Sequence, residues 1–119
     1  MAENILKVKS YNSAIRIVKL SQYLINKKKE FVISNQVLRS GAAIGALIRE
    51  SEYGQTKQDF IHKLSVSLKE ASETEYWLCI LKDTGYTERN LYNSLIDDCK
   101  ELLKLLIANV KTAKKGYPG

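Results

Sequence analysis

Two glycines lie one helical turn apart in a segment, residues 36–50, that otherwise has the sequence of a helix. A glycine inside a helix costs about 1 kcal/mol relative to alanine. Positions four residues apart share one helix face, so Gly41 and Gly45, with Ala42 and Ala46 beside them, make a smooth surface. A second helix can approach such a surface closely. The spacing therefore predicts tight helix packing at Gly41 and Gly45, within the chain or between copies of it.

The same segment is too polar for a membrane, because it carries Arg39, Arg49 and Glu50. Elsewhere no apolar run approaches the roughly 18 residues of a membrane span. The first residues lack the charged start and long apolar stretch of a signal peptide. Cys79 and Cys99 are far apart in apolar helical patterns, which is typical of reduced core cysteines. We therefore expect a cytoplasmic protein.

Helical periodicity runs through most of the chain. A length of 119 residues predicts one domain over 1–119, with frayed ends at about 1–7 and 115–119. Apolar spacing predicts four helices and no strand, over about 10–28, 34–52, 56–84 and from 87 onward. Short connections between long helices favour an all-α, antiparallel up-down-up-down four-helix bundle.

Small polar residues and a glycine mark the predicted helix ends. Ser34, Thr56 and Thr87 are each suited to accept a hydrogen bond from the free N–H groups of a helix start. Gly85 is suited to end the third helix, because glycine adopts the left-handed conformation found there.

The last helix has the clearest apolar seam. Its members follow a 4-4-3-4-4 spacing and are Leu91, Leu95, Cys99, Leu102, Leu106 and Val110. Four further residues widen the apolar surface beyond one seam: Ile96, Leu103, Leu105 and Ile107. A helix that is apolar on more than one face must be covered on more than one face. This surplus predicts a homo-oligomer.

The net charge of +6 is unevenly distributed. Residues 1–49 contain nine Lys or Arg and two acidic residues, whereas residues 50–119 contain ten Lys or Arg and eleven acidic residues. In an antiparallel bundle the two termini and the loop around Gly54 meet at one pole. The candidate nucleic-acid-binding residues are Lys7, Lys9, Arg16, Lys19, Arg49, Lys57, Lys111, Lys114 and Lys115. A basic surface can attract RNA, DNA or an acidic protein, and the alternative is that the charge serves only solubility.

A second polar group suggests a structural role. Glu70, Glu73 and Trp77 lie on neighbouring turns of the predicted third helix, and Arg39 precedes the glycine face. If the second and third helices pack through that face, Arg39 can reach Glu70 or Glu73. A partly buried ion pair of this kind sets the register of two helices. The candidate packing or assembly residues are Arg39, Gly41, Gly45, Glu70, Glu73 and Trp77.

Catalytic and metal-binding patterns are missing from the sequence. His62 is the one histidine, and no second ligand stands at metal-binding spacing from it. The Glu-x-x-His elements of di-iron bundles and the Gly-Lys-Ser/Thr of a phosphate loop are also absent. We expect no enzyme activity, no cofactor and no metal.

Several motifs, taken together, resemble those of one family. The central one combines Leu38-Arg39-Ser40-Gly41, Ile44-Gly45-Ala46 and Glu50. The further matches are Arg16-Ile17-Val18-Lys19-Leu20, Gln36, Gln55, Asp59-Phe60, Lys63, Lys69-Glu70-Ala71, Glu73-Thr74 and Tyr76-Trp77-Leu78. Over roughly residues 7–110 the chain resembles the small bacterial four-helix bundle proteins named after the intervening sequences of 23S ribosomal RNA genes.

The resemblance implies an antiparallel four-helix bundle that assembles into a ring-like homo-oligomer, a pentamer. Accessory proteins of diversity-generating retroelements look like relatives, and they form basic five-subunit barrels that engage nucleic acid and a reverse transcriptase. Ala42, Ala43 and Leu47 depart from the family pattern, where Thr, Ser and Asn are frequent. The loss of these polar side chains argues for packing rather than a polar site on the second helix.

Two functions of different classes remain open. The first is a non-enzymatic oligomer that binds structured RNA or another nucleic acid through a basic surface. The second is a protein-binding or scaffolding module with no role in nucleic-acid binding. Salt separates the two, because phosphate contacts weaken steeply with salt and apolar contacts do not.

Overall fold

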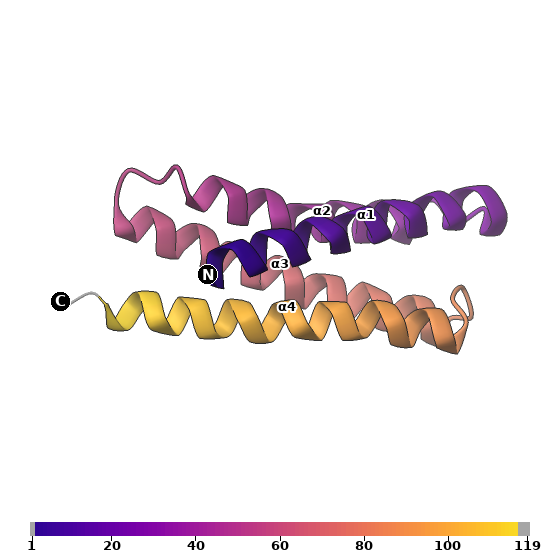
Figure 1. Cartoon of the computed structure of the whole chain (residues 1–119). Helices are drawn as coiled ribbons and strands as arrows, with labels where there is room; N and C mark the ends of the chain where they lie inside the picture. Colours follow the sequence, from indigo (N-terminus) through magenta and orange to yellow (C-terminus); the bar gives the residue numbers. More distant parts are fainter. Residues whose placement is uncertain (1, 117–119) are drawn as a thin grey trace.

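The computed structural model describes residues 2–116, with side chains from Ile5 onward. Four helices make up this part of the chain: α1 (Ala2–Lys28), α2 (Val32–Ser51), α3 (Lys57–Asp83) and α4 (Arg89–Lys115). They run alternately up and down along a bundle of about 50 × 22 × 21 Å (Figure 1). α1 and α3 each pack against both α2 and α4. The all-α four-helix fold predicted from the sequence is therefore confirmed.

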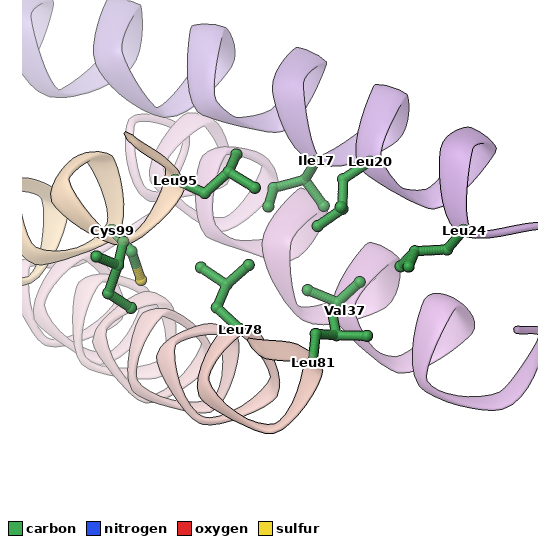
Figure 2. Packing of buried hydrophobic residues seen from close by; sticks show 9 residues of the cluster. Ile17, Leu20, Leu24, Val37, Leu78, Leu81, Leu95 and Cys99 are labelled. Carbon is green, nitrogen blue, oxygen red and sulfur yellow. The ribbon is translucent and has the colours of Figure 1, made fainter. Parts of the chain in front are cut away.

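The core consists of two apolar clusters stacked along the bundle axis. One contains residues from all four helices, and their side chains point toward one another in Figure 2: Ile17, Leu20, Leu24, Val37, Leu78, Leu81, Leu95, Ile96 and Cys99. The other lies toward the end of the bundle that holds the α2–α3 connection: Leu6, Ile44, Ile48, Leu64, Ala71, Leu102, Leu106 and Val110. The predicted seam of α4 thus supplies the core from Leu95 to Val110, while Leu91 packs at its edge.

The first helix is longer than its sequence pattern predicts. α1 begins at Ala2 rather than near Ser10, and Leu6 is only 2% exposed. The expectation of a frayed segment over residues 1–7 is therefore wrong at Leu6, because this side chain fills the second core cluster. At the other end Lys115 belongs to α4 and Gly116 caps it, whereas residues 117–119 lie outside the described residues.

An acidic side chain, not Ser34, caps the start of α2. The Glu30 carboxylate accepts hydrogen bonds from the backbone N–H of Ser34 at 2.7 Å and of Val32 at 3.3 Å. The Ser34 hydroxyl is instead buried against α1, 2.8 Å from the Ser21 hydroxyl. The predicted Ser34 cap is wrong because α2 begins two residues earlier, which places Ser34 inside the helix.

The two ends of α3 follow the sequence prediction. Thr56 Oγ1 accepts a hydrogen bond from the backbone N–H of Asp59 at 3.0 Å. At the C-terminal end Gly85 has φ +83°, in the left-handed region. The N–H groups of Gly85 and Tyr86 donate to the carbonyls of Lys82 and Leu81, which satisfies the last turn of the helix.

Thr87 does not cap α4. The capping position belongs to Glu88, whose side chain makes no capping hydrogen bond. Thr87 is buried instead, and within the described part of the chain its Oγ1 has no hydrogen-bond partner. The prediction failed because the turn after Gly85 directs Thr87 inward.

Candidate nucleic-acid interface

The glycine face of α2 packs against α1. A Cβ atom on Gly41 would lie 2.8 Å from Ile17 Cγ2, and one on Gly45 would lie 3.3 Å from Ser10 Oγ. The close approach predicted at these two glycines therefore exists within the chain. The helix opposite them is not α3, as the sequence analysis supposed. Arg39 lies two residues before Gly41, which turns it to another side of α2.

Arg39 holds α2 to α3 on that other side. Its guanidinium pairs with Glu70 at 3.2 Å and with Glu73 through its second terminal nitrogen. Glu73 also accepts a hydrogen bond from Trp77 Nε1 at 3.0 Å. Two carboxylates of α3 thereby hold one arginine of α2, and Trp77 holds one of the two carboxylates. These contacts fix the register of α2 against α3, and their arrangement is that of a structural ion pair rather than a catalytic site.

Three predicted binding cations of α1 are already paired with carboxylates of other helices. The pairs are Lys7–Glu52 at 3.0 Å, Lys9–Glu101 at 3.1 Å and Arg16–Asp98 at 2.5 Å. Their partners lie 45 to 92 residues away in the sequence, so spacing along the chain could not reveal them. The first part of α1 is accordingly less basic at its surface than its composition indicates.

The other predicted cations differ in their surroundings. Lys19 and Arg49 are exposed, and no ion pair to another described residue engages either of them. Lys57 begins α3 and lines a cleft at the pole of the bundle, and it has an interaction partner of its own. The predicted basic pole is therefore partly neutralised.

The second half of α4 presents a basic surface. After Glu101 the chain contains no acidic residue, but it contains Lys104, Lys111, Lys114 and Lys115. All four lysines are exposed, and none has an ion pair with a residue that the structure describes. Sequence reasoning missed Lys104, although the one-sided charge after Glu101 could have pointed to it.

An open cleft of about 1000 Å³ adjoins this end of α4. It lies between the last turns of α4, at Thr112, Ala113 and Gly116, and the α2–α3 connection. Phe60 and Ile61 contribute apolar surface to it. In Figure 1 the end of α4 extends beyond the start of α1.

The exposed apolar side chains gather on α1 rather than on α4. They follow its length at helical spacing and are Ile5, Val8, Tyr11, Ile15, Val18 and Ile25. On α4, Ile96 joins the core and Ile107 is the exposed one, at 41%. The surplus apolar surface therefore exists, but most of it lies on a different helix from the one the sequence indicated.

A shallow groove of about 500 Å³ runs beside this apolar stripe, between α1 and α2. Small residues form its floor: Ala14, Ala42, Gly45 and Ala46. Tyr11 and Tyr53, both exposed, stand at its edges. The glycine face of α2 therefore has two roles. Gly41 and Gly45 pack against α1, and Gly45 also lies on the floor of the open groove.

Groups with chemical reactivity are scattered. His62 is exposed, and among residues with described side chains no three His, Cys, Asp or Glu are placed to hold a metal ion. A hydrogen bond with Cys79 at 3.4 Å and burial raise the pKa of Tyr92 to about 12. Lys82 Nζ lies 4.5 Å from the centre of the same ring. These contacts join Tyr92 of α4 to Cys79 and Lys82 of α3. No helix in the described part of the chain is long and apolar enough to span a membrane.

Comparison with known proteins decides the family. The family model for the 23S rRNA-intervening sequence protein matches residues 3–108. The chain belongs to the 23S rRNA-intervening sequence protein family. It is also similar to a crystal structure from Bacteroides thetaiotaomicron, described as a protein with unknown function from the S23 ribosomal protein family. The two share 52% identity over 93% of this chain and 99% of the other, with a TM-score of 0.92. No curated protein matches the chain.

The three departures from the family motif are partly buried positions of α2. Ala42 lines the α1–α2 groove, and Ala43 and Leu47 are half-buried. The groove floor is consequently apolar. Its composition suits packing against another apolar surface.

Proposed function

We propose that the protein is a non-enzymatic, self-associating helical protein that binds structured RNA or another nucleic acid through its exposed lysines. One observation carries the proposal: the ion pairs of the bundle leave a surface with exposed, unpaired cations. Lys19, Lys104 and Lys111 are exposed, and none of them has an ion pair with another residue that the structure describes. Exposed lysines of this kind therefore carry most of the excess positive charge that gives the chain its net charge of +6.

Electrostatics connects this surface with nucleic acids. Lysines that neutralise phosphates release condensed counterions, and this release drives sequence-independent binding. The seven tyrosines are scattered along the sequence, which differs from the stacking aromatic residues that single-strand-binding sheets present. We therefore expect phosphate contacts and weak sequence readout.

The apolar face of α1 supports self-association. Tyr11 and Val8 are 57% and 58% exposed, and the neighbouring groove has a floor of small residues. Exposed apolar patches of this kind mark interaction sites. The family resemblance suggests the form of the assembly, a homo-pentameric ring.

A protein-binding module is the second candidate, and the same α1 face favours it. A partner of another sequence, such as a reverse transcriptase, could cover that face in place of a second copy. In that case the lysines would serve solubility alone. This candidate predicts a complex that persists at high salt.

Light scattering coupled to size-exclusion chromatography tests the proposal. The nuclease-treated protein is run alone, with a structured ribosomal RNA fragment and with a DNA duplex, at about 50 and 200 mM salt. We expect a free mass that is a multiple of 13.5 kDa, and an RNA complex that is lost at the higher salt. A monomer refutes self-association. The absence of any complex at low salt refutes nucleic-acid binding.

A further inference from the structure

The lysines of the second half of α4 form a straight row. Lys104, Lys111 and Lys115 are separated by seven and four residues, which places them within an arc of roughly 40° on an ideal helix. The arc is opposite the side of α4 that supplies Leu102 and Leu106 to the core. The three ammonium groups therefore project directly away from the bundle.

The row is long enough to lie against several phosphates of a duplex. Eleven residues of helix separate Lys104 from Lys115, a rise of about 16 Å. Each strand of a duplex carries one phosphate per roughly 3.4 Å of axis. A straight row of this length can contact phosphates where the surface of a duplex passes across it.

No acidic residue lies within the row itself, from Lys104 to Lys115. The chain after Glu101 contains no carboxylate side chain, and Glu101 itself is paired with Lys9. Ile107 and Ala108, which lie between Lys104 and Lys111, are exposed and uncharged. The last turns extend past the start of α1, so a long partner can approach them from the open side (Figure 1).

We propose that α4 from Lys104 to Lys115 is the element that contacts nucleic acid, and that its partner is the phosphate backbone of a double-stranded segment. This inference rests on the proposed function and assigns its site. A duplex fits better than a single strand because residues 102–116 include no aromatic side chain on which a base could stack. The shared chemistry is the phosphodiester backbone, whether the duplex is RNA or DNA.

The presence of Lys114 and Lys115 can also be explained by their position in the last turn of α4. Cations in the last turn of a helix interact favourably with its dipole. Lys104 lies three turns before the end of α4 and gains nothing from this effect, since the dipole acts within the last turn. Helix-end stabilisation therefore does not explain a lysine at position 104. The effect of Lys104 on binding distinguishes a nucleic-acid-binding row from lysines that only stabilise the end of the helix.

The test compares two triple variants of the full chain. K104Q/K111Q/K115Q removes the row, and K27Q/K28Q/K29Q removes the same charge from exposed lysines at the C-terminal end of α1, none of which is a candidate binding residue. Binding is followed by fluorescence anisotropy with a 20-base-pair RNA duplex, a DNA duplex of the same sequence and the corresponding single strands. Circular dichroism and urea denaturation establish that both variants are folded.

We expect the α4 variant to bind duplexes about tenfold or more weakly, with a salt slope shallower by roughly 2 to 3, while the α1 variant changes less than threefold. K104Q alone should weaken binding measurably. Equal weakening of both triple variants would show that net charge alone matters and would overturn this assignment while leaving nucleic-acid binding intact. Preference for the single strands would also overturn it. Failure of the unmodified protein to bind any probe would refute the proposed function itself. The RNA and DNA arms identify which duplex is preferred.

Discussion

Gly41 lies so close to Ile17 that a Cβ atom on the glycine would stand 2.8 Å from Ile17 Cγ2. Four residues later the same approach is looser, with 3.3 Å from a Cβ on Gly45 to Ser10 Oγ. α1 and α2 therefore converge most tightly at Gly41. The two glycines share one helix face, but a side chain at Gly41 would meet a closer neighbour than one at Gly45.

Gly41→Ala should destabilise the bundle by about 1–2 kcal/mol. The strain of overpacking against buried Ile17 exceeds the roughly 1 kcal/mol that alanine gains in helix propensity. Gly45→Ala is the control and should be within about 0.5 kcal/mol of neutral, because strain and propensity offset each other there. Urea denaturation measures both. Identical midpoints for the two variants would contradict the difference in packing.

Arg39→Ala should lower the free energy of unfolding by about 1 kcal/mol, more than Lys28→Ala. Arg39 engages Glu70 and Glu73 together, whereas Lys28 lies near the Tyr23 ring at 6.0 Å and has no ion pair with another described residue. The arginine is half exposed, so the effect stays small and should decrease with salt. Denaturation at low and high salt measures it. Equal midpoints for the two variants would mean that the Arg39 pairs contribute nothing to stability.

Glu30→Ala should cost about 1–2 kcal/mol, because it removes the carboxylate that caps α2. Glu88→Ala is the matched control: Glu88 occupies the capping position of α4 but makes no capping hydrogen bond, so its loss should have little effect. Chemical denaturation of the two variants gives the comparison. A larger loss for Glu88→Ala would show that the assignment of the α2 cap is wrong.

The Cys99 thiol should resist labelling in the folded protein at pH 8. Burial raises its pKa from 9.0 to about 12, so almost no thiolate forms there. The unfolded thiol ionises at lower pH than the folded one. The stability that depends on this thiol is therefore complete below about pH 9 and lost as the pH rises toward 12. Alkylation followed by mass spectrometry, with and without urea, measures accessibility. Rapid labelling of Cys99 without urea would contradict its burial.

Val8→Glu should reduce the mass of the assembly without unfolding the bundle. The side chain is 58% exposed on the apolar face of α1, so the charge disturbs a partner surface and not the core. Light scattering gives the mass and circular dichroism the helix content. Retention of the full mass would place the self-association surface elsewhere.

Local patterns were sufficient to predict most of the fold. The spacing of Leu95, Cys99, Leu102 and Leu106 identified the buried side of α4, and Gly85 identified the end of α3. The start of α1 was missed because buried Ser10 interrupts the apolar pattern that links Leu6 to the rest of the helix. Polar residues in a core give no sign of their burial in the sequence.

The candidate site was harder to predict, because its charges are arranged by tertiary contacts. Lys9 and Arg16 were expected to be free, but α4 supplies Glu101 and Asp98 to them. The sequence correctly predicted that Arg39 pairs with carboxylates of α3. The prediction assumed that the glycine face of α2 packs against α3, whereas this face packs against α1. Which cations remain unpaired depends on how the helices are placed around each other.

The most direct measurement is the salt dependence of duplex RNA binding by the nuclease-treated protein, from about 50 to 300 mM salt. A row of three lysines that contacts phosphates predicts a linear fall of log K with log salt, with a slope of about −3 or steeper. A slope near zero, or no binding at the lowest salt, would contradict the claim that the exposed lysines form a nucleic-acid surface.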